Sequence, residues 1–380
     1  MDHQQLSFVR TQLPSVIDYA FFNTGTAGPV PIPVAERMKG VLERQLLRGR
    51  ITLDYYQETD RWKKEIRASL ASMIKCSEDE IALTSSTTEG INLVINGMDW
   101  KSGDEIITSN VEHPAGYTPL FQARNRYGIH IKYLDLLGSK ENWLEELEGL
   151  ISTNTKLISL SHVSYCTGHI TPLKEMCEIA HKHNIPVLVD GAQSFMSIPV
   201  DMKELGCDFY AAPGQKWLCG PEETGFLYVA KKHIDSLHAV YTGYGSFKEL
   251  DMYGMDLHEN AQRFEYGTVQ PINIAGMLEA CKWLEKIGVD DVLERIQVLN
   301  REAWEMLADT KGVNLVTREP GSGLIAFHFK DKAPGDVTEA LLHKGVLVRP
   351  VPITDAVRIS TGFYNNSDDL FKLTEALVEI

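Results

Sequence analysis

The chain has 380 residues, of which 43% are hydrophobic, so it has material for a large core and, as a prior, for two domains. Lys and Arg number 37 and Asp and Glu 52, giving a net charge of −15 that argues against general nucleic-acid binding. No apolar run approaches the ~18 residues that a membrane span requires. The N-terminus lacks the basic start and apolar stretch of a signal peptide, so we expect a cytoplasmic protein that binds neither nucleic acid nor membranes.

Short apolar strands alternate with amphipathic helices between about residues 80 and 230. This alternation is typical of an α/β fold with a mostly parallel sheet covered by helices on both faces. Ligands bind beyond the carboxyl ends of the strands in such sheets. The predicted strands are 81–83, 105–108, 131–134, 156–160, 187–190, 209–212 and 225–229, and helices are predicted at 114–126, 143–151 and 173–183.

The pattern changes after about residue 275 and predicts a smaller α+β domain. We expect this small domain to comprise 271–380, with the segment 1–25 packed against it, and a large domain to comprise 26–270. The predicted elements of the small domain are helices at 272–286, 289–307, 336–343 and 368–378, and strands at 313–317, 324–329, 346–348 and 357–361.

Residues with useful chemistry follow several of the predicted large-domain strands. The run 84–90, Thr-Ser-Ser-Thr-Thr-Glu-Gly, has hydroxyls and free N–H groups that suit a phosphate, and ordinary helix capping also accounts for it. His113 stands at a strand-to-helix junction, where an imidazole can lie on a cofactor ring or simply cap the helix. Asp190 ends an apolar strand, and its carboxylate can hold a pyridine nitrogen protonated or serve as an N-cap.

Lys216 lies in an apolar setting, with Pro-Gly-Gln before it and Trp-Leu after it. A lysine in a loop is usually a solvated surface charge. In an apolar pocket its pKa falls, and the amine can then form a Schiff base and act as a general base. The offset from Asp190 is 26 residues (216 − 190), which allows one crossover and one further strand. Both side chains can therefore reach one cleft, where Gln193 could donate to a phenolic oxygen.

Taken in order, the runs 84–89, 110–114, 187–194, 215–224 and 263–268 resemble the class V aminotransferase family, and the resemblance extends over nearly the whole chain. That family contains cysteine desulfurases, C-S lyases, isopenicillin N epimerase-like proteins and kynureninase. The resemblance implies fold-type I, with a mostly parallel seven-stranded sheet in the large domain. It also implies a pyridoxal 5'-phosphate cofactor, an amino-acid substrate and a homodimer.

The resemblance assigns a role to each matching position. Lys216 resembles the Schiff-base lysine, and Asp190 the partner of the pyridine nitrogen. Thr268 resembles a threonine that reaches the phosphate in the neighbouring subunit, so that each site needs two chains. Further cofactor contacts are expected from Thr87, Thr88, His113, Gln193 and Gln215, and substrate contacts from Arg358, Arg349 and Tyr165, while for Arg349 an exposed strand end remains the alternative.

Three departures from the family pattern affect the expected reaction. Gln215 and Pro213 replace a histidine and a serine that touch phosphate in many relatives. Tyr165 stands where desulfurases have an asparagine that contacts the substrate carboxylate, a pattern that favours the lyase and epimerase-like branches. No cysteine lies between Cys281 and Arg358, where desulfurases carry the thiol that accepts sulfur as a persulfide.

These departures predict β-elimination from a sulfur-containing amino acid by Lys216, without a persulfide cysteine. Epimerisation, transamination and an atypical desulfuration that uses Cys166 or Cys219 are the alternatives. A non-catalytic binding protein would lack the lysine or the aspartate. A dinucleotide-binding dehydrogenase would need a Gly-x-Gly-x-x-Gly turn, which 23–28 does not supply, so that segment is predicted to be an active-site loop. The six cysteines are scattered without a Cys-x-x-Cys pair, which is typical of reduced thiols, and no metal site is expected.

Overall fold

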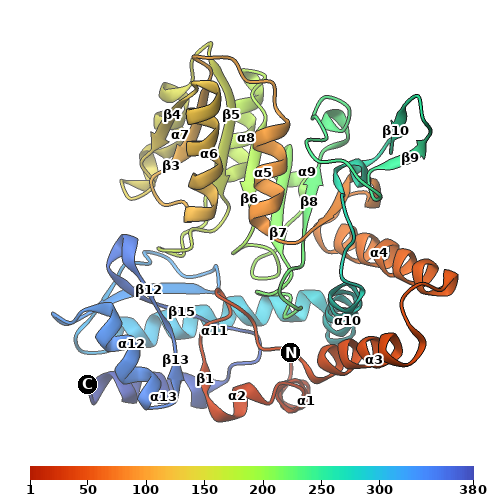
Figure 1. Cartoon of the computed structure of the whole chain (residues 1–380). Coiled ribbons are helices and arrows are strands. Elements are labelled where there is room, and N and C mark those ends of the chain that lie inside the picture. Colours follow the sequence, from red (N-terminus) through yellow and green to blue (C-terminus); the bar gives the residue numbers. More distant parts are fainter.

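The computed structural model describes residues 1–380 and contains a seven-stranded sheet with strand order β2-β8-β7-β6-β5-β3-β4 (Figure 1). Only β8 runs antiparallel to its neighbours. The central strands are buried on both faces, as expected where helices cover both sides of a parallel sheet. All seven predicted strands are present: β2 (Ile81–Thr84), β3 (Glu105–Ser109), β4 (His130–Leu134), β5 (Thr155–Ser161), β6 (Val187–Asp190), β7 (Phe209–Pro213) and β8 (Gly225–Val229).

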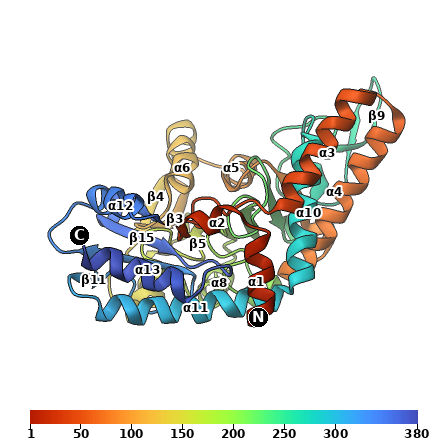
Figure 2. The same cartoon turned by 90° about the horizontal axis from the view of Figure 1, so that it is seen from below.

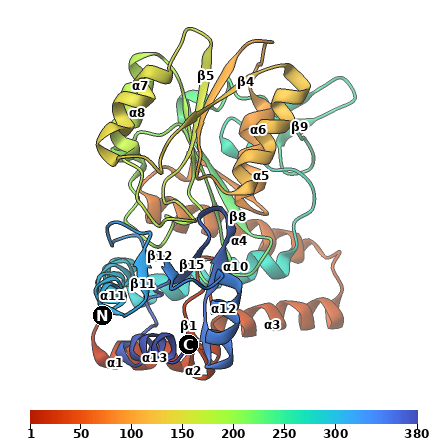
Figure 3. The ribbon, with the colours of Figure 1, turned by 90° about the vertical axis from the view of Figure 1, so that its left-hand side faces the viewer.

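Helices cover both faces of this sheet. Figure 3 shows α7 (Trp143–Leu150) and α8 (Leu173–Lys182) on one face, and α5 (Thr87–Gly97) and α6 (Pro114–Tyr127) on the other. Alternate residues of the strands contribute to separate hydrophobic clusters, because successive side chains of a strand point to opposite faces. A short helix, α9 (Met202–Leu205), follows β6.

The second, smaller sheet is antiparallel, with strand order β11-β12-β15-β14. The predicted strand 346–348 is divided in the structure, because β13 pairs in parallel with β1 of the N-terminal segment and the chain then enters β14. The strands are β1 (Ala20–Phe21), β11 (Val313–Leu315), β12 (Leu324–Phe329), β13 (Val346–Leu347), β14 (Arg349–Val351) and β15 (Ala356–Ser360), and the helices beside them are α11 (Val289–Asp309), α12 (Pro334–His343) and α13 (Ser367–Val378).

A third group of helices lies beside both sheets and was largely missed by the sequence analysis. Figure 2 shows α3 (Ile32–Arg48) and α4 (Leu53–Ile74) alongside α10 (Pro271–Ile287), and both pack against α10. The N-terminal helices are α1 (His3–Thr11) and α2 (Ser15–Asp18). A hairpin of β9 (Phe247–Leu250) and β10 (Met255–Leu257) protrudes from the large sheet's side of the molecule.

The α/β architecture, with a mostly parallel seven-stranded sheet and a smaller C-terminal α+β part, is the one that the sequence predicted. One hydrophobic cluster of 58 buried residues runs from the N-terminal helices through α10 to the large sheet. We propose the boundaries 26–270 for the large domain and 1–25 with 271–380 for the small domain. No helix is both long and apolar enough to cross a membrane.

Candidate active site

A cavity of about 230 Å³ lies at the carboxyl ends of the large sheet's strands and is closed by residues of the small sheet. Ten of the eleven predicted site residues line it: Thr87, Thr88, His113, Tyr165, Asp190, Gln193, Gln215, Lys216, Arg349 and Arg358. The eleventh, Thr268, does not line this cavity and is exposed between Phe264 and α10. These ten residues come from six parts of the sequence, which meet in one hollow.

Lys216 is held in the turn that joins β7 to β8. Its carbonyl accepts a hydrogen bond from Cys219 N (3.0 Å), and the preceding carbonyl of Gln215 accepts one from Gly28 N (2.8 Å). The pKa of Lys216 is lowered from 10.5 to about 8, mainly by burial; Asp190 opposes this shift, and Arg358 and Arg349 contribute to it. A minority of the amine is therefore neutral and nucleophilic at pH 7, and the neutral form becomes the major one above pH 8.

Asp190 ends β6 and is 7% exposed. Its Oδ1 accepts a hydrogen bond from Ala192 N (2.8 Å). Burial raises the pKa of Asp190, while Lys216 and the Ala192 N–H oppose that rise. A buried carboxylate with so few donors has a strong tendency to pair with a cation, and a protonated pyridine nitrogen satisfies that tendency.

His113 is the N-cap of α6, and its Nδ1 accepts a hydrogen bond from Ala115 N (3.2 Å). Its ring makes an edge-to-face contact with Tyr165, with centroids 4.9 Å apart. Burial lowers the pKa of His113 to about 4, and the cations Lys216, Arg349 and Arg358 contribute in the same direction. The imidazole is therefore neutral at pH 7, so it can stack on an aromatic ring without adding a charge.

The N-terminus of α5 provides an anion site on another wall of the cavity. Ser86 caps the helix, with its Oγ accepting from Glu89 N (3.1 Å), while the first helical residues, Thr87 and Thr88, line the cavity. Helix N-terminal N–H groups and the dipole favour a phosphate there. Thr87 Oγ1 is buried without a hydrogen-bond partner, and so is Oε1 of Gln215. Buried polar atoms left unpaired in this way indicate a missing partner.

Two arginines from the small sheet form the opposite wall. Arg349 and Arg358 lie directly opposite each other in the pairing of β14 with β15. Arg358 is 1% exposed and donates to the carbonyl of Tyr165 (3.0 Å), while its Nε has no partner. Burial and Arg349 lower the pKa of Arg358 to about 9, so its guanidinium still carries a charge at neutral pH. Two cations face the cavity, and their hydrogen bonds go to Thr26 and to the carbonyl of Tyr165 rather than to a carboxylate.

The sequence analysis missed the role of Thr26 in arranging these arginines. Thr26 Oγ1 accepts hydrogen bonds from Arg349 Nη1 (3.0 Å) and Arg358 Nη2 (3.3 Å). Gly25, beside it, accepts at its carbonyl from Gln193 Nε2 (2.7 Å), which leaves that amide one hydrogen for a ligand. The segment 23–28 is a loop packed on the Lys216 turn, and Gly25 and Thr26 line the cavity. It has no strand-turn-helix geometry for a dinucleotide.

Neither cysteine near the site has the properties of a reactive thiol. Cys166 and Cys219 are both fully buried and do not line the cavity. Burial raises the pKa of Cys166 to about 11 and that of Cys219 to about 12, which suppresses the thiolate at neutral pH.

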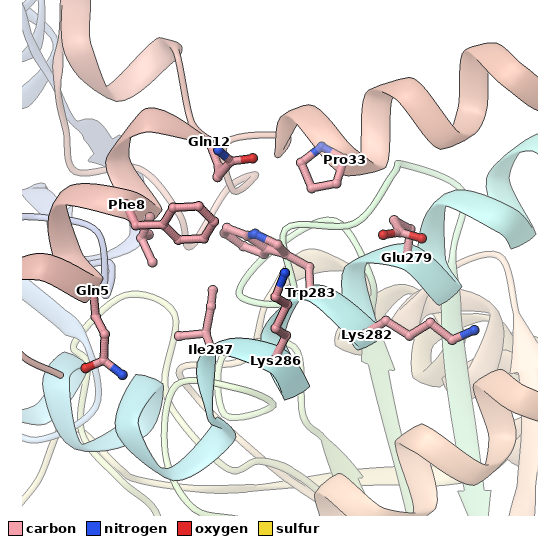
Figure 4. A pocket seen from close by; sticks show the side chains of 10 residues that line it. Gln5, Phe8, Gln12, Pro33, Glu279, Lys282, Trp283, Lys286 and Ile287 are labelled. Atoms are coloured by element: carbon pink, nitrogen blue, oxygen red, sulfur yellow. The ribbon is translucent and has the colours of Figure 1, made fainter.

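A second hollow, of about 310 Å³, lies between α1, α3 and α10 (Figure 4). Its lining surrounds Trp283 and includes Phe8, Pro33 and Lys286. It contains none of the predicted site residues, and its Lys282 is already paired with Glu65 (2.6 Å). We therefore assign no chemistry to it.

The lysine, the buried aspartate, the neutral histidine and the helix N-terminus match the four needs of pyridoxal phosphate: an amine for its aldehyde, an anion for its ring nitrogen, a surface for its ring and donors for its phosphate. The unpaired Thr87 hydroxyl and the underpaired Asp190 carboxylate are the observations that make the fit specific. Fold and site thus define a pyridoxal phosphate-dependent enzyme.

Comparison with known proteins gives the family. The model of the class V aminotransferase family matches residues 19–373, and the chain belongs to that family. A probable cysteine desulfurase of Halalkalibacterium halodurans is 33% identical over 79% of this chain and 77% of its own length. A cysteine desulfurase of Shigella flexneri is 32% identical over 83% of this chain and 80% of its own length.

Among solved structures, a complex of the cystine C-S lyase C-DES with its reaction product cysteine persulfide has a TM-score of 0.92 and 25% identity, covering 97% of this chain and 100% of that one. The predicted family, fold class and cofactor are thus confirmed. The relatives' names divide between desulfurase and lyase, so they do not decide the reaction.

Proposed function

We propose that the protein is a C-S lyase, which removes a sulfur-containing group from Cβ of an amino acid by β-elimination. The observation that carries this proposal is the cavity itself, because Lys216 is the one amine beside Asp190 and no cysteine lines the cavity. Elimination needs a base at Cα and a stabilised carbanion, and it does not need a thiol nucleophile.

In this proposal Lys216 would hold the cofactor, and its Nζ would take the proton from Cα of the substrate. The cofactor supplies the electron sink that stabilises the negative charge at Cα. Asp190 would pair with the ring nitrogen, His113 would cover a ring face, and Gln193 would donate to the phenolic oxygen. Thr87, Thr88 and Gln215 are proposed to hold the phosphate.

The electron pair left at Cα forms a double bond to Cβ, and the Cβ–S bond breaks so that sulfur leaves with the bonding pair. Hydrolysis of the released fragment gives pyruvate and ammonia. For cystine the balance is one cystine and one water giving one pyruvate, one ammonia and one cysteine persulfide. No oxidant or reductant is required.

We further propose that the substrate is a disulfide amino acid of the cystine type. Arg358, buried and with its Nε unpaired, would bind the α-carboxylate beside Tyr165. Arg349 would bind the second carboxylate, because the cavity contains two uncompensated guanidinium groups and a monocarboxylate can neutralise one of them. The cystine C-S lyase C-DES, whose fold this chain shares, supports the same substrate class.

Cysteine desulfuration is the second candidate, and the names of the relatives favour it. Desulfuration requires a thiolate that attacks the substrate sulfur. Here burial raises the pKa values of Cys166 and Cys219, and no cysteine lies between Cys281 and Arg358. These facts favour elimination.

We also propose that the enzyme is a homodimer in which Thr268 contacts the cofactor phosphate of the neighbouring subunit. Thr268 is exposed in the single chain, which is the position that such a contact needs. Exposed apolar side chains near the junction of α3 and α4 support a covered surface there: Leu42, Leu46, Leu47, Ile51 and Leu53. Light scattering of the purified protein tests the dimer, and a monomer at working concentration contradicts it.

A panel of substrates distinguishes the reactions. The cofactor-loaded enzyme is incubated with cystine, cysteine, S-methylcysteine and alanine, and pyruvate, sulfide, other oxo-acids and D-isomers are measured, with Lys216→Ala as the inactive control. Pyruvate from the sulfur compounds alone is expected. D-alanine from L-alanine would indicate an epimerase, and conversion of the cofactor to its amine form would indicate transamination.

A further inference from the structure

Glu112, the residue before His113, is a buried carboxyl group that the proposed mechanism does not use. It is 2% exposed. Its Oε1 accepts hydrogen bonds from Ser109 Oγ (2.6 Å) and from the backbone N of Ser161 (3.0 Å), and its Oε2 accepts one from Ser161 Oγ. These three donors offset the free-energy cost of burying the carboxyl group.

The carboxylate lies where two neighbouring strands separate. The pairing of β3 with β5 ends at Ile107 and Ile158, although β3 continues to pair with β4 as far as Ser109 and Leu134. On its other side β5 pairs with β6 up to Ser161 opposite Asp190. The backbone N–H of Ser161 is therefore satisfied by a side chain, and the Glu112 carboxylate replaces β3 at the sheet edge that faces the cavity.

This geometry connects Glu112 to two walls of the site. Through the chain it fixes His113, the next residue, at the start of α6. Through Ser161, which itself lines the cavity, it fixes the end of β5 beside Asp190. One carboxylate thus fixes the positions of both His113, which is proposed to cover the cofactor ring, and Asp190, which is proposed to pair with the ring nitrogen.

We propose that Glu112 is a positioning residue that sets the spacing between His113 and Asp190 around the cofactor ring and adds a second negative charge behind that ring. The proposal rests on the roles given above to His113 and Asp190. Glu112 does not touch the cavity, so its effect is exerted through Ser161 and the local field.

Burial and the charge of Asp190 raise the pKa of Glu112 to about 7, whereas the hydrogen bonds from Ser109 and Ser161 oppose the rise. At pH 8 and above the group is therefore mostly ionised. The titratable groups whose charges act on it belong to three elements or loops: Asp190 at the end of β6, Tyr117 on α6, and Tyr165 and Cys166 in the loop after β5.

Glu112→Gln tests the proposal, because the amide keeps the size and removes the charge and one acceptor. Two quantities are measured besides activity: the pH at which the visible absorption of the lysine-bound cofactor changes, and the dissociation constant of the cofactor. Loss of a nearby negative charge makes protonation of the bound cofactor less favourable, so we expect the midpoint to fall by about one pH unit. We expect the dissociation constant to rise about tenfold, as the ring contacts lose their spacing.

Glu105→Gln is the matched control. Glu105 lies at the opposite end of β3, where it also accepts hydroxyl hydrogen bonds, from Ser152 Oγ (2.5 Å) and Thr155 Oγ1 (3.2 Å). It therefore bridges the same two strands away from the cavity, and its loss should leave the spectral midpoint unchanged. Glu112→Asp, which keeps the charge with a shorter reach, should retain the midpoint and still weaken cofactor binding.

The outcomes separate this inference from the proposed function. A wild-type protein without the lysine-bound absorption band would contradict the proposed function itself. With that band present, the inference is overturned if Glu112→Gln matches wild type in midpoint and cofactor affinity, or if Glu105→Gln shifts the midpoint equally. If Glu112→Gln does not fold, a changed midpoint in Glu112→Asp overturns the charge argument, and unchanged cofactor affinity in that variant overturns the positioning argument.

Discussion

Replacing Arg349 should separate disulfide substrates from monocarboxylate substrates. In Arg349→Met the side chain keeps most of its length but loses the charge and the hydrogen bond to Thr26 (3.0 Å). A hydrogen bond between a charged group and a carboxylate contributes about 1.5–3 kcal/mol. Because Arg349 is partly exposed, we take about 2 kcal/mol, which corresponds to a roughly 30-fold change.

The assay is continuous pyruvate formation with cystine and with S-methylcysteine. We expect kcat/KM for cystine to fall about 30-fold and that for S-methylcysteine to fall less than about threefold. Arg349 also lowers the pKa of Lys216, so the pH profile of the variant should move to higher pH with both substrates. Arg318→Met is the control, since Arg318 donates to carbonyls away from the cavity. Equal losses with both substrates would refute the assignment of Arg349 to a second carboxylate.

Three further predictions concern Lys216 and its surroundings. The pKa of Lys216 is lowered to about 8, so its neutral amine becomes the major form above pH 8. The rate of cofactor uptake by the apoenzyme should therefore rise through pH 8 and then level off. A rise that continues to pH 10 would contradict the lowered pKa. Cys166→Ser should retain the rate of pyruvate formation within about twofold, because the thiol is buried and its pKa is raised to about 11. Loss of turnover in a folded variant would instead indicate that Cys166 accepts sulfur. Gly28→Ala would place a Cβ 2.3 Å from the carbonyl oxygen of Lys216. Thermal denaturation should therefore show a loss of about 1–3 kcal/mol in the free energy of unfolding, together with weaker cofactor binding. An unchanged melting temperature would contradict this close packing.

The large sheet and the residues at its strand ends could be predicted because they follow from local pattern. Buried parallel strands are short apolar runs, and their carboxyl ends share one edge. Asp190 and Lys216 could therefore be assigned to one cleft, because they are 26 residues apart and each lies at or just after the end of a predicted strand. Both line the cavity. The helices α3 and α4 were missed, although α4 buries a residue every three or four positions, as an amphipathic helix does: Tyr55, Thr59, Trp62, Ile66, Leu70 and Ile74. In α3 the pattern is weaker, because Leu42, Leu46 and Leu47 are exposed.

The residues that arrange the site depend on register and on contacts between distant segments. Arg349 and Arg358 meet because they are opposite in the pairing of β14 with β15, which the sequence spacing of nine residues does not specify. Thr26 joins them through a loop more than 300 residues earlier. Glu112 acts where two strands separate, and such a divergence leaves no sequence pattern. Local periodicity thus predicts where strands end. It does not predict which distant residues contact those strand ends.

The ratio of pyruvate to alanine formed from cystine or cysteine, measured with the cofactor-loaded wild-type enzyme in the absence of other proteins, tests the central claim most directly. Elimination by Lys216 without a sulfur-accepting thiol predicts pyruvate and ammonia in equal amounts, no alanine, and no sulfur bound to the protein. Alanine formed together with a persulfide on a cysteine of this chain would contradict the account.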